Sequence, residues 1–125
     1  MYVALFWGKV RSEWQNDHYA QLGLRMFECA SQSPGFVALH RFEVPDGREL
    51  AIAYFDTKED LETWYNNSEH RAVEALGRRD ILEDYTIEIL EMVRSYTKAS
   101  STFEATSAEL RAADKLASDP RSIIS

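Results

Sequence analysis

The sequence predicts an α+β fold of the ferredoxin-like type, with a βαββαβ order and an antiparallel sheet covered on one face by helices. Two observations predict it. Strand-like and helical residue spacings alternate along the chain in that order, and a turn motif joins the two central strands. A chain of 125 residues suits one domain, which we place at residues 1–96, followed by an extension at residues 97–125.

The first half of the domain holds the clearest patterns. A near-continuous apolar run at residues 2–10 predicts a buried first strand, and helical spacing follows from residue 12 until Ser33, Pro34 and Gly35 stop it. Strand patterns at residues 36–44 and 48–55 are joined by Pro45, Asp46 and Gly47, the residue types of a hairpin turn. We therefore expect a hairpin here.

The second half of the domain begins with a broken helix. Asp56 is expected to cap its first part, in which the spacing of Leu61 and Trp64 turns both side chains inward. A polar elbow at residues 66–68 interrupts the helix, which resumes at Ser68 or Glu69 and ends at Gly77.

The last predicted strand covers residues 85–93, with apolar residues on one face and acidic residues partly on the other. In the extension, a short helix is expected at residues 108–117, and residues 119–125 are expected to fray.

The predicted sheet is apolar on both faces. Consecutive apolar positions occur on the first and third strands, as in Leu5, Phe6 and Trp7 and in Ile52, Ala53 and Tyr54. A face exposed to water should be polar, and two helices can cover only one face. The sequence therefore predicts a two-fold homodimer in which a second copy covers the other face, giving a dimeric α+β barrel.

Charge and cysteine content restrict the partners. The net charge is −7, and the extension from Thr97 holds equal numbers of acidic and basic residues, so the excess lies in the domain. This argues against nucleic acid, which needs clustered Lys and Arg. Cys29 is the single cysteine, the N-terminus lacks the order of a secretory signal, and no apolar run approaches bilayer length, so we expect a cytoplasmic protein without membrane contact.

The candidate site lies where the broken helix bends. We predict His70 as the catalytic residue, because an imidazole can accept or donate a proton near neutral pH. The alternative is that His70 only hydrogen-bonds the elbow, and Trp64 can equally be core. The predicted substrate-binding residues are Trp64, Tyr54, His40, Trp7 and Asn67.

Two of these predictions depend on strand alternation. His40 and Arg41 interrupt an apolar strand, and adjacent strand residues point to opposite faces, so one of the two should face the helices. His40 would line the same cavity as Tyr54 if it shares the face of Phe36 and Ala38. Trp7 could belong either to the cleft or to the dimer interface.

Residues 2–96 resemble the antibiotic biosynthesis monooxygenase domain proteins of the dimeric α+β barrel superfamily. The likeness rests on the opening strand, on two segments that flank the central strands, and on positions in the second helical region and last strand. These are Pro34 to Phe36, Phe55 to Glu62, Trp64, His70, Arg71, Gly77, Arg78 and Tyr85.

This resemblance implies a monooxygenase that needs no metal or flavin and acts on a small aromatic or electron-rich molecule. Such members carry an Asn on the third strand and a Trp at its end, where this chain has Ala51 and Phe55. Haem-degrading members use an axial His where this chain has Glu74, and a Trp to which Trp64 corresponds. No cofactor is therefore expected, and the alternative function is a non-catalytic dimer that binds a small ligand, haem included.

Overall fold

The computed structural model describes residues 1–118 and contains two compact units, Met1–Val93 and a second that begins at Arg94. In chain order, the first unit consists of β1 (Tyr2–Val10), the short turn η1 (Ser12–Trp14), α1 (Asp17–Ser31), β2 (Phe36–Glu43), β3 (Glu49–Phe55), α2 (Lys58–Tyr65), α3 (Ser68–Leu76), the π-helical turn η2 (Gly77–Ile81) and β4 (Leu82–Glu91).

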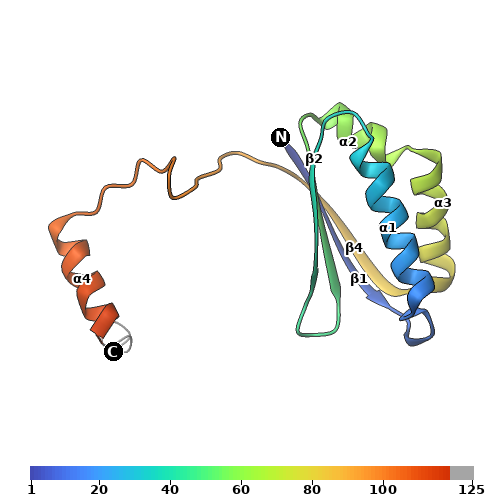
Figure 1. The fold of residues 1–125 in the computed structure, drawn as a ribbon, viewed down its shortest axis with the longest axis horizontal. Coiled ribbons are helices and arrows are strands. Elements are labelled where there is room, and N and C mark those ends of the chain that lie inside the picture. Colours follow the sequence, from blue (N-terminus) through green and yellow to red (C-terminus); the bar gives the residue numbers. More distant parts are fainter. Residues whose placement is uncertain (119–125) are drawn as a thin grey trace. The chain divides into compact units, whose positions relative to one another are not determined.

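The four strands form one antiparallel sheet in the order β2-β3-β1-β4. The three helices α1, α2 and α3 lie together on one side of this sheet (Figure 1). The predicted ferredoxin-like order is confirmed, with the second helix divided into α2 and α3 at the polar elbow.

The predicted hairpin between β2 and β3 is confirmed as well. Gly47 has a φ of 90°, a left-handed conformation that glycine adopts without a steric penalty, and its N–H donates to the carbonyl of Val44 at 2.9 Å. This turn fixes the pairing of β2 with β3.

Several predicted boundaries were wrong. The first long helix begins at Asp17 and not at residue 12, where the short turn η1 lies, and β4 ends at Glu91 and not at residue 93. Thr57, and not Asp56, caps α2, because the Thr57 hydroxyl accepts from the Asp60 amide at 3.1 Å. Gly77 does not end the helical region and β4 begins before Tyr85, since η2 continues from Gly77 to Ile81 and β4 starts at Leu82. The added turn carries Ile81 into the interior, where only 3% of it is exposed.

The core lies between the sheet and the helices at the end where β3 leads into α2. Phe55 is fully buried, and Leu61 and Trp64 of α2 pack against it together with Ala30 and Ala53. The prediction that Leu61 and Trp64 face inward is therefore confirmed. Burial of a side chain the size of Phe55 stabilises the fold by roughly 1.5–3 kcal/mol.

We call the sheet face toward the helices the inner face and the opposite one the outer face. The outer face is largely apolar, as predicted. From the pairing of the strands, its residues are Val3, Leu5, Trp7, Ala38, His40, Phe42, Leu50, Ile52, Tyr54, Thr86, Glu88 and Leu90. Phe42 is 53% exposed and Leu90 is 46% exposed in the single chain. Such a surface suits contact with another protein surface.

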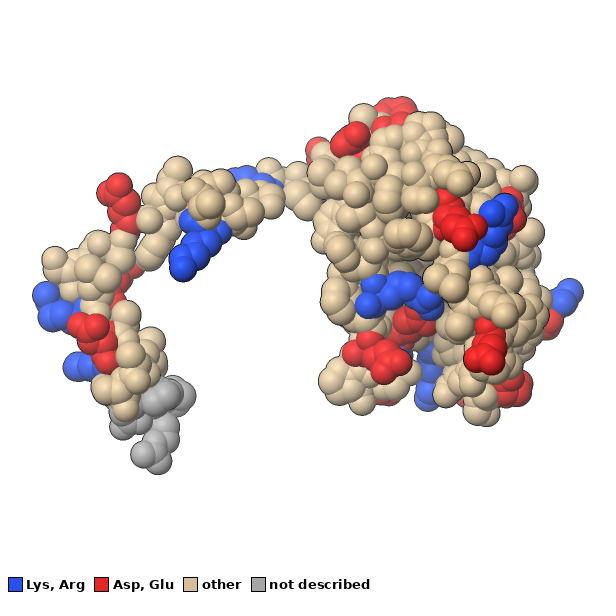
Figure 2. Space-filling view, in the orientation of Figure 1, with Lys and Arg blue, Asp and Glu red and all other residues tan. Residues whose placement is uncertain are grey.

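The second unit contains one helix, α4 (Ser107–Ser118), which confirms the helix predicted at residues 108–117. The expected fraying of residues 119–125 concerns positions outside the described residues. Among residues 1–118, no helix combines the length and the apolar character that crossing a membrane requires. On the face drawn in Figure 2, charged residues form small groups of both signs.

Candidate functional site

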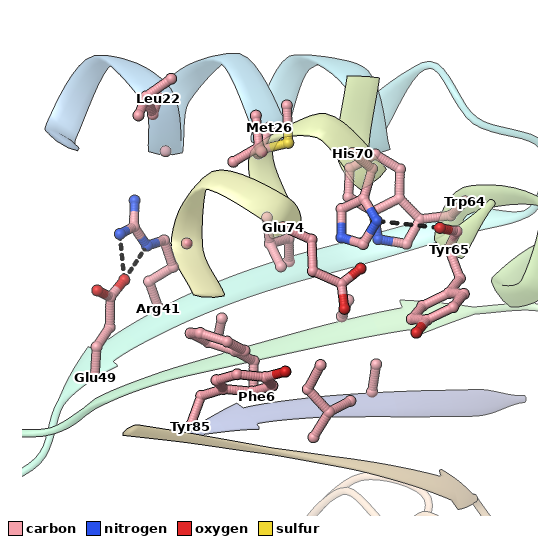
Figure 3. Close-up of a pocket in the computed structure, with 18 of the residues that line it drawn as sticks. Phe6, Leu22, Met26, Arg41, Glu49, Trp64, Tyr65, His70, Glu74 and Tyr85 are labelled. Atoms are coloured by element: carbon pink, nitrogen blue, oxygen red, sulfur yellow. Dashed lines mark hydrogen bonds and ion pairs between the residues drawn. The ribbon is translucent and has the colours of Figure 1, made fainter. Parts of the chain in front are cut away.

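A cavity of about 240 Å³ lies between the helices and the inner face of the sheet (Figure 3). Residues from all four strands, the helices and the π-helical turn line it. They are Ala4, Phe6, Tyr19, Leu22, Gly23, Met26, Leu39, Arg41, Glu49, Ala51, Ala53, Leu61, Trp64, Tyr65, His70, Val73, Glu74, Gly77, Ile81, Leu82, Tyr85, Ile87 and Ile89. Most of these side chains are apolar, which suits a small hydrophobic ligand.

The size of the inner-face residues explains why there is a cavity here. Ala4 on β1 and Ala51 and Ala53 on β3 form part of its floor. Ala4 and Ala53 are directly opposite each other in the strand pairing. Because alanine projects only a methyl group, the central strands leave space beneath the helices. Ile87 and Ile89 of the edge strand β4 remain 36% and 48% exposed, so the cavity opens to solvent beside β4.

His70 lies at one end of the cavity, on the first turn of α3. The Asn67 side chain caps this helix by accepting from the amides of Glu69 and His70, each at 3.0 Å. The imidazole lies against the Trp64 ring, with the ring centroids 4.3 Å apart. Cap and ring contact together fix where the imidazole lies.

The hydrogen bonding of His70 defines which ring nitrogen is free. Nδ1 lies 3.3 Å from the carbonyl oxygen of Tyr65, which can only accept a hydrogen bond. In the neutral imidazole, Nδ1 therefore carries the proton and Nε2 carries a lone pair. No described residue hydrogen-bonds Nε2, so this atom is available as a base or a ligand.

The surroundings of His70 also favour its neutral form. Burial lowers the pKa of His70 below its ordinary value, although the hydrogen bond to the Tyr65 carbonyl and the nearby Glu74 carboxylate oppose this shift. The imidazole is therefore mainly neutral at pH 7 and able to accept a proton.

The other end of the cavity is polar. Figure 3 shows Arg41 and Glu49 there, away from Trp64, Tyr65 and His70. The Arg41 Nε donates to Glu49 Oε1 at 2.6 Å, and the Tyr19 hydroxyl donates to Glu49 Oε2 at 2.5 Å.

The protonation of Tyr19 follows from this contact. Burial first, and then the hydrogen bond to Glu49, raise the pKa of Tyr19 far above its ordinary value. The phenol thus stays protonated and donates to the carboxylate. Among the described residues that line the cavity, His70 supplies the one imidazole, and no thiol is present.

The structure brings together Trp64 and His70 among the predicted site residues, since both line the cavity. Asn67 lies beside them in sequence, but its carboxamide oxygen is engaged in the α3 cap and it is not part of the lining. Its contribution to this cavity is to position His70.

The predicted positions of His40, Tyr54 and Trp7 as cavity walls need correction, because all three lie on the outer face. A bulge at Val37 shifts the register of β2, so that Phe36 pairs with the buried Phe55 whereas Ala38 pairs with Tyr54. His40 consequently follows Ala38 to the outer face, where its ring is 6.1 Å from that of Tyr54.

Trp7 belongs to the outer face by the same strand alternation. Its Nε1 donates to Glu88 at 2.9 Å, and the Arg48 guanidinium lies 4.8 Å from the centre of its ring. Of the two places that the sequence left open for Trp7, the structure excludes the cavity between the helices and the sheet.

Sequence reasoning missed Tyr19 and Glu49 and named Arg41 only as an unusual strand residue. A signal existed for Arg41, because one of His40 and Arg41 had to face the helices. The bulge at Val37 could not be seen in the sequence, so strand alternation did not show whether His40 or Arg41 faces the helices. Tyr19 carried a weaker signal, its position four residues before Gly23 on the same helix face.

The comparisons with known proteins agree with this fold. No protein-family model matches the chain. A curated relative, the uncharacterized protein YqjZ from Bacillus subtilis (strain 168), is 28% identical over 93 residues, which are 74% of this chain and 81% of that protein.

Solved structures resemble the chain at lower identity. An antibiotic biosynthesis monooxygenase superposes with a TM-score of 0.65 at 17% identity, covering 75% of this chain and 100% of that one. SnoaB, a cofactor-independent oxygenase from Streptomyces nogalater, gives 0.64 at 12% identity over 75% and 94% of the two chains. MhuD, solved with two manganese protoporphyrin IX per active site, gives 0.58 at 15% identity over 78% and 99%.

The chain therefore has the fold of the antibiotic biosynthesis monooxygenase proteins, and the resemblance seen in the sequence is confirmed for the fold. Such a fold carries more than one function, since its bearers include an oxygenase and a porphyrin-binding protein. Within residues 1–118, no three His, Cys, Asp or Glu side chains gather as a metal site would require.

Proposed function

We propose that this protein is a cofactor-independent monooxygenase that acts on a small aromatic or otherwise electron-rich molecule bound in the cavity. The observation that carries the proposal is His70, a neutral imidazole whose Nε2 is free at one end of an otherwise apolar cavity. Fold likeness to the oxygenase SnoaB supports the same reaction class.

In the proposed reaction, His70 Nε2 removes a proton from an acidic O–H or C–H group of the substrate. The resulting anion passes one electron to dioxygen, and the two radicals combine to a peroxide at a carbon that still carries one hydrogen. Loss of water from the peroxide leaves a carbonyl on that carbon. One oxygen atom enters the substrate, and the other leaves as water with that hydrogen and the proton that His70 returns.

The remaining cavity residues would hold the substrate and exclude water. Trp64 fixes the imidazole and offers an aromatic wall, and the alanine floor admits a flat ring system. Ala51 and Phe55 stand where the resemblance implies an Asn and a Trp, so proton transfer in this chain would depend on His70 alone.

Oxygen consumption tests this proposal. We expect steady oxygen uptake when the protein is supplied with electron-rich phenols, and a fall of about 10²–10⁴-fold in His70→Gln, the usual contribution of a general base. His18→Gln is the matched control, because His18 is an exposed imidazole that packs against Trp14 outside the cavity. Unchanged turnover in His70→Gln would refute the catalytic role.

We further propose that the protein is a homodimer, formed through the outer face. The large apolar side chains there, Phe42 and Leu90 among them, are exposed in the single chain and would be buried by the same face of a second copy. Sedimentation should show particles of twice the 14.4 kDa chain mass at micromolar concentration. A single cysteine fits the reducing cytoplasm in which we expect the protein to act.

A second candidate function is the binding of a small ligand without catalysis, with haem as one such ligand. The free Nε2 of His70 favours it, since a neutral imidazole nitrogen is also a metal ligand. Ligand-dependent thermal stabilisation without oxygen uptake would identify a binder. A shift of the haem Soret band that disappears in His70→Ala would identify haem as the ligand.

A further inference from the structure

We propose that Arg41, held in place by Glu49 and Tyr19, selects ligands that carry a neutral hydrogen-bond acceptor, such as a ketone oxygen, at the end remote from His70. This inference rests on the proposed function, because it concerns the ligand bound in the same cavity. It adds the recognition of one ligand group by one named residue.

The three residues come from three different elements and close one end of the cavity. Tyr19 lies on α1, Arg41 on β2 and Glu49 on β3, and all three line the cavity. The Glu49 carboxylate binds both partners, with Oε2 accepting from the Tyr19 hydroxyl and Oε1 from the Arg41 guanidinium. Arg41 is thereby fixed in a single orientation at the end of an apolar space.

The guanidinium keeps unused donors in this arrangement. Arg41 reaches Glu49 through Nε and Nη2, whereas no hydrogen bond of Nη1 to a described residue is formed. An arginine carries five N–H donors, and Nη1 supplies two of them. Nη1 lies close to Gly23 of α1, and because Arg41 and Gly23 both line the cavity, we infer that these N–H groups can donate to a ligand oxygen there.

Gly23 makes room for this group. It lies one helical turn after Tyr19 on α1, and a Cβ at this position would overlap Nη1 of Arg41. A residue with a side chain would therefore push the guanidinium away from α1 and out of its present position. The glycine makes the close approach of Arg41 to the helix feasible.

The charge balance indicates which ligand group fits. The Glu49 side chain is 17% exposed and that of Arg41 is 37% exposed, and together they carry no net charge. A carboxylate ligand would lie beside the Glu49 carboxylate and be repelled by it. A neutral carbonyl oxygen can accept from Nη1 without this repulsion, and a hydrogen bond from a charged donor is among the stronger ones.

A set of three ligands tests the inference by calorimetry. The probes are a naphthol with an acetyl group on the far ring, its ethyl analogue and its carboxylate analogue. We expect the native protein to bind the acetyl compound about tenfold more tightly than either analogue, as one charge-assisted hydrogen bond allows. Equal affinities for the acetyl and ethyl compounds would overturn the inference and leave the proposed function standing.

Variants assign the preference to Arg41. The double variant Arg41→Met with Glu49→Gln removes both charges, so no unpaired carboxylate remains. It should bind the ethyl compound within about twofold of the native protein and lose the tenfold preference for the acetyl compound. If the ion pair only joins β2 to β3, this variant will lose stability and keep the preference, which contradicts the inference.

Two further variants complete the experiment. Gly23→Ala should also abolish the preference by displacing the guanidinium, and it serves if the double variant does not fold. Arg48→Gln is the matched control, because Arg48 lies against Trp7 of the outer face and should leave the preference unchanged. If the native protein binds none of the three probes, the proposed function fails together with this inference.

Discussion

The two faces of the sheet are both largely apolar, and they differ in side-chain size at three inner positions of the central strands. On the inner face, alanines at positions 4, 51 and 53 lie on the central strands, and a cavity remains between them and the helices. On the outer face, the same two strands carry Leu5, Trp7, Ile52 and Tyr54. Small residues thus make a binding space, and large residues make a surface suited to another chain.

This difference shows that hydrophobicity alone does not distinguish a binding face from an interface face. Both faces are built largely from apolar residues. The volume of the side chains, together with the element that covers them, decides whether space is left for a ligand. Substitutions on each face can therefore separate stability, assembly and binding.

The largest effect is expected in the core below the inner face. Phe55→Ala should lower the free energy of unfolding by about 3–5 kcal/mol, because it leaves a cavity at a fully buried position. Phe42→Ala is the matched control on the outer face, where the side chain is 53% exposed, and should cost the isolated chain less than about 1 kcal/mol. Urea unfolding measures both at protein concentrations too low for the proposed dimer to form, and equal losses would contradict the distinction.

Assembly should be most sensitive to the outer face. Ile52→Asp places a charge at the centre of the proposed interface, and two-fold symmetry places it there twice. We expect dimerisation to weaken at least about 100-fold, which corresponds to about 3 kcal/mol. Sedimentation equilibrium measures this change. A dimer of unchanged strength would show that the outer face is not the interface.

Binding should respond to the inner face. Ala51→Leu fills part of the cavity floor with a larger side chain, so ligand affinity should fall at least about tenfold while the fold is retained. Calorimetry with an aromatic ligand measures the loss. The neighbouring substitution Leu50→Ala on the outer face should leave ligand affinity unchanged, and a loss there would contradict the separation of the two faces.

The smallest effect concerns the protonation of His70. Since burial lowers its pKa in the folded protein, the unfolded chain binds a proton first as the pH falls. Stability should therefore decrease below about pH 6.5, with a slope of at most about 1.4 kcal/mol per pH unit, until the folded-state pKa is reached. Urea unfolding at several pH values measures this slope, and in His70→Gln the contribution of His70 to it should be absent. If the stability of the native protein instead increased as the pH falls through this range, the lowered pKa of His70 would be contradicted.

The sequence was sufficient for the fold because its signals are local and repeated. The spacing of apolar residues, the Gly47 turn and the polar elbow identified the strands, the hairpin and the division of the second helix. The start of α2 was predicted wrongly because two neighbouring residues compete for the cap position. Thr57 and Asp56 can both cap a helix, and only the path of the backbone after Phe55 selects Thr57.

The site could be predicted only in part, because it depends on which face each strand residue takes. Trp64 and His70 could be predicted as neighbours from the helical pattern and the polar elbow, and both line the cavity. The bulge at Val37 puts Arg41 on the inner face and His40 on the outer face, and this bulge has no sequence signature as clear as a glycine turn. The Arg41–Glu49 pair joins two strands and becomes visible only with the register known.

The position of β4 at the edge of the sheet has a consequence for aggregation. An edge strand has unpaired backbone N–H and C=O groups, with which a strand of another protein molecule can pair. Within its ten residues, β4 carries the carboxylates of Glu83, Asp84, Glu88 and Glu91. These carboxylates would repel those of a second copy that added along the same edge, so the charge of β4 disfavours polymerisation through this strand.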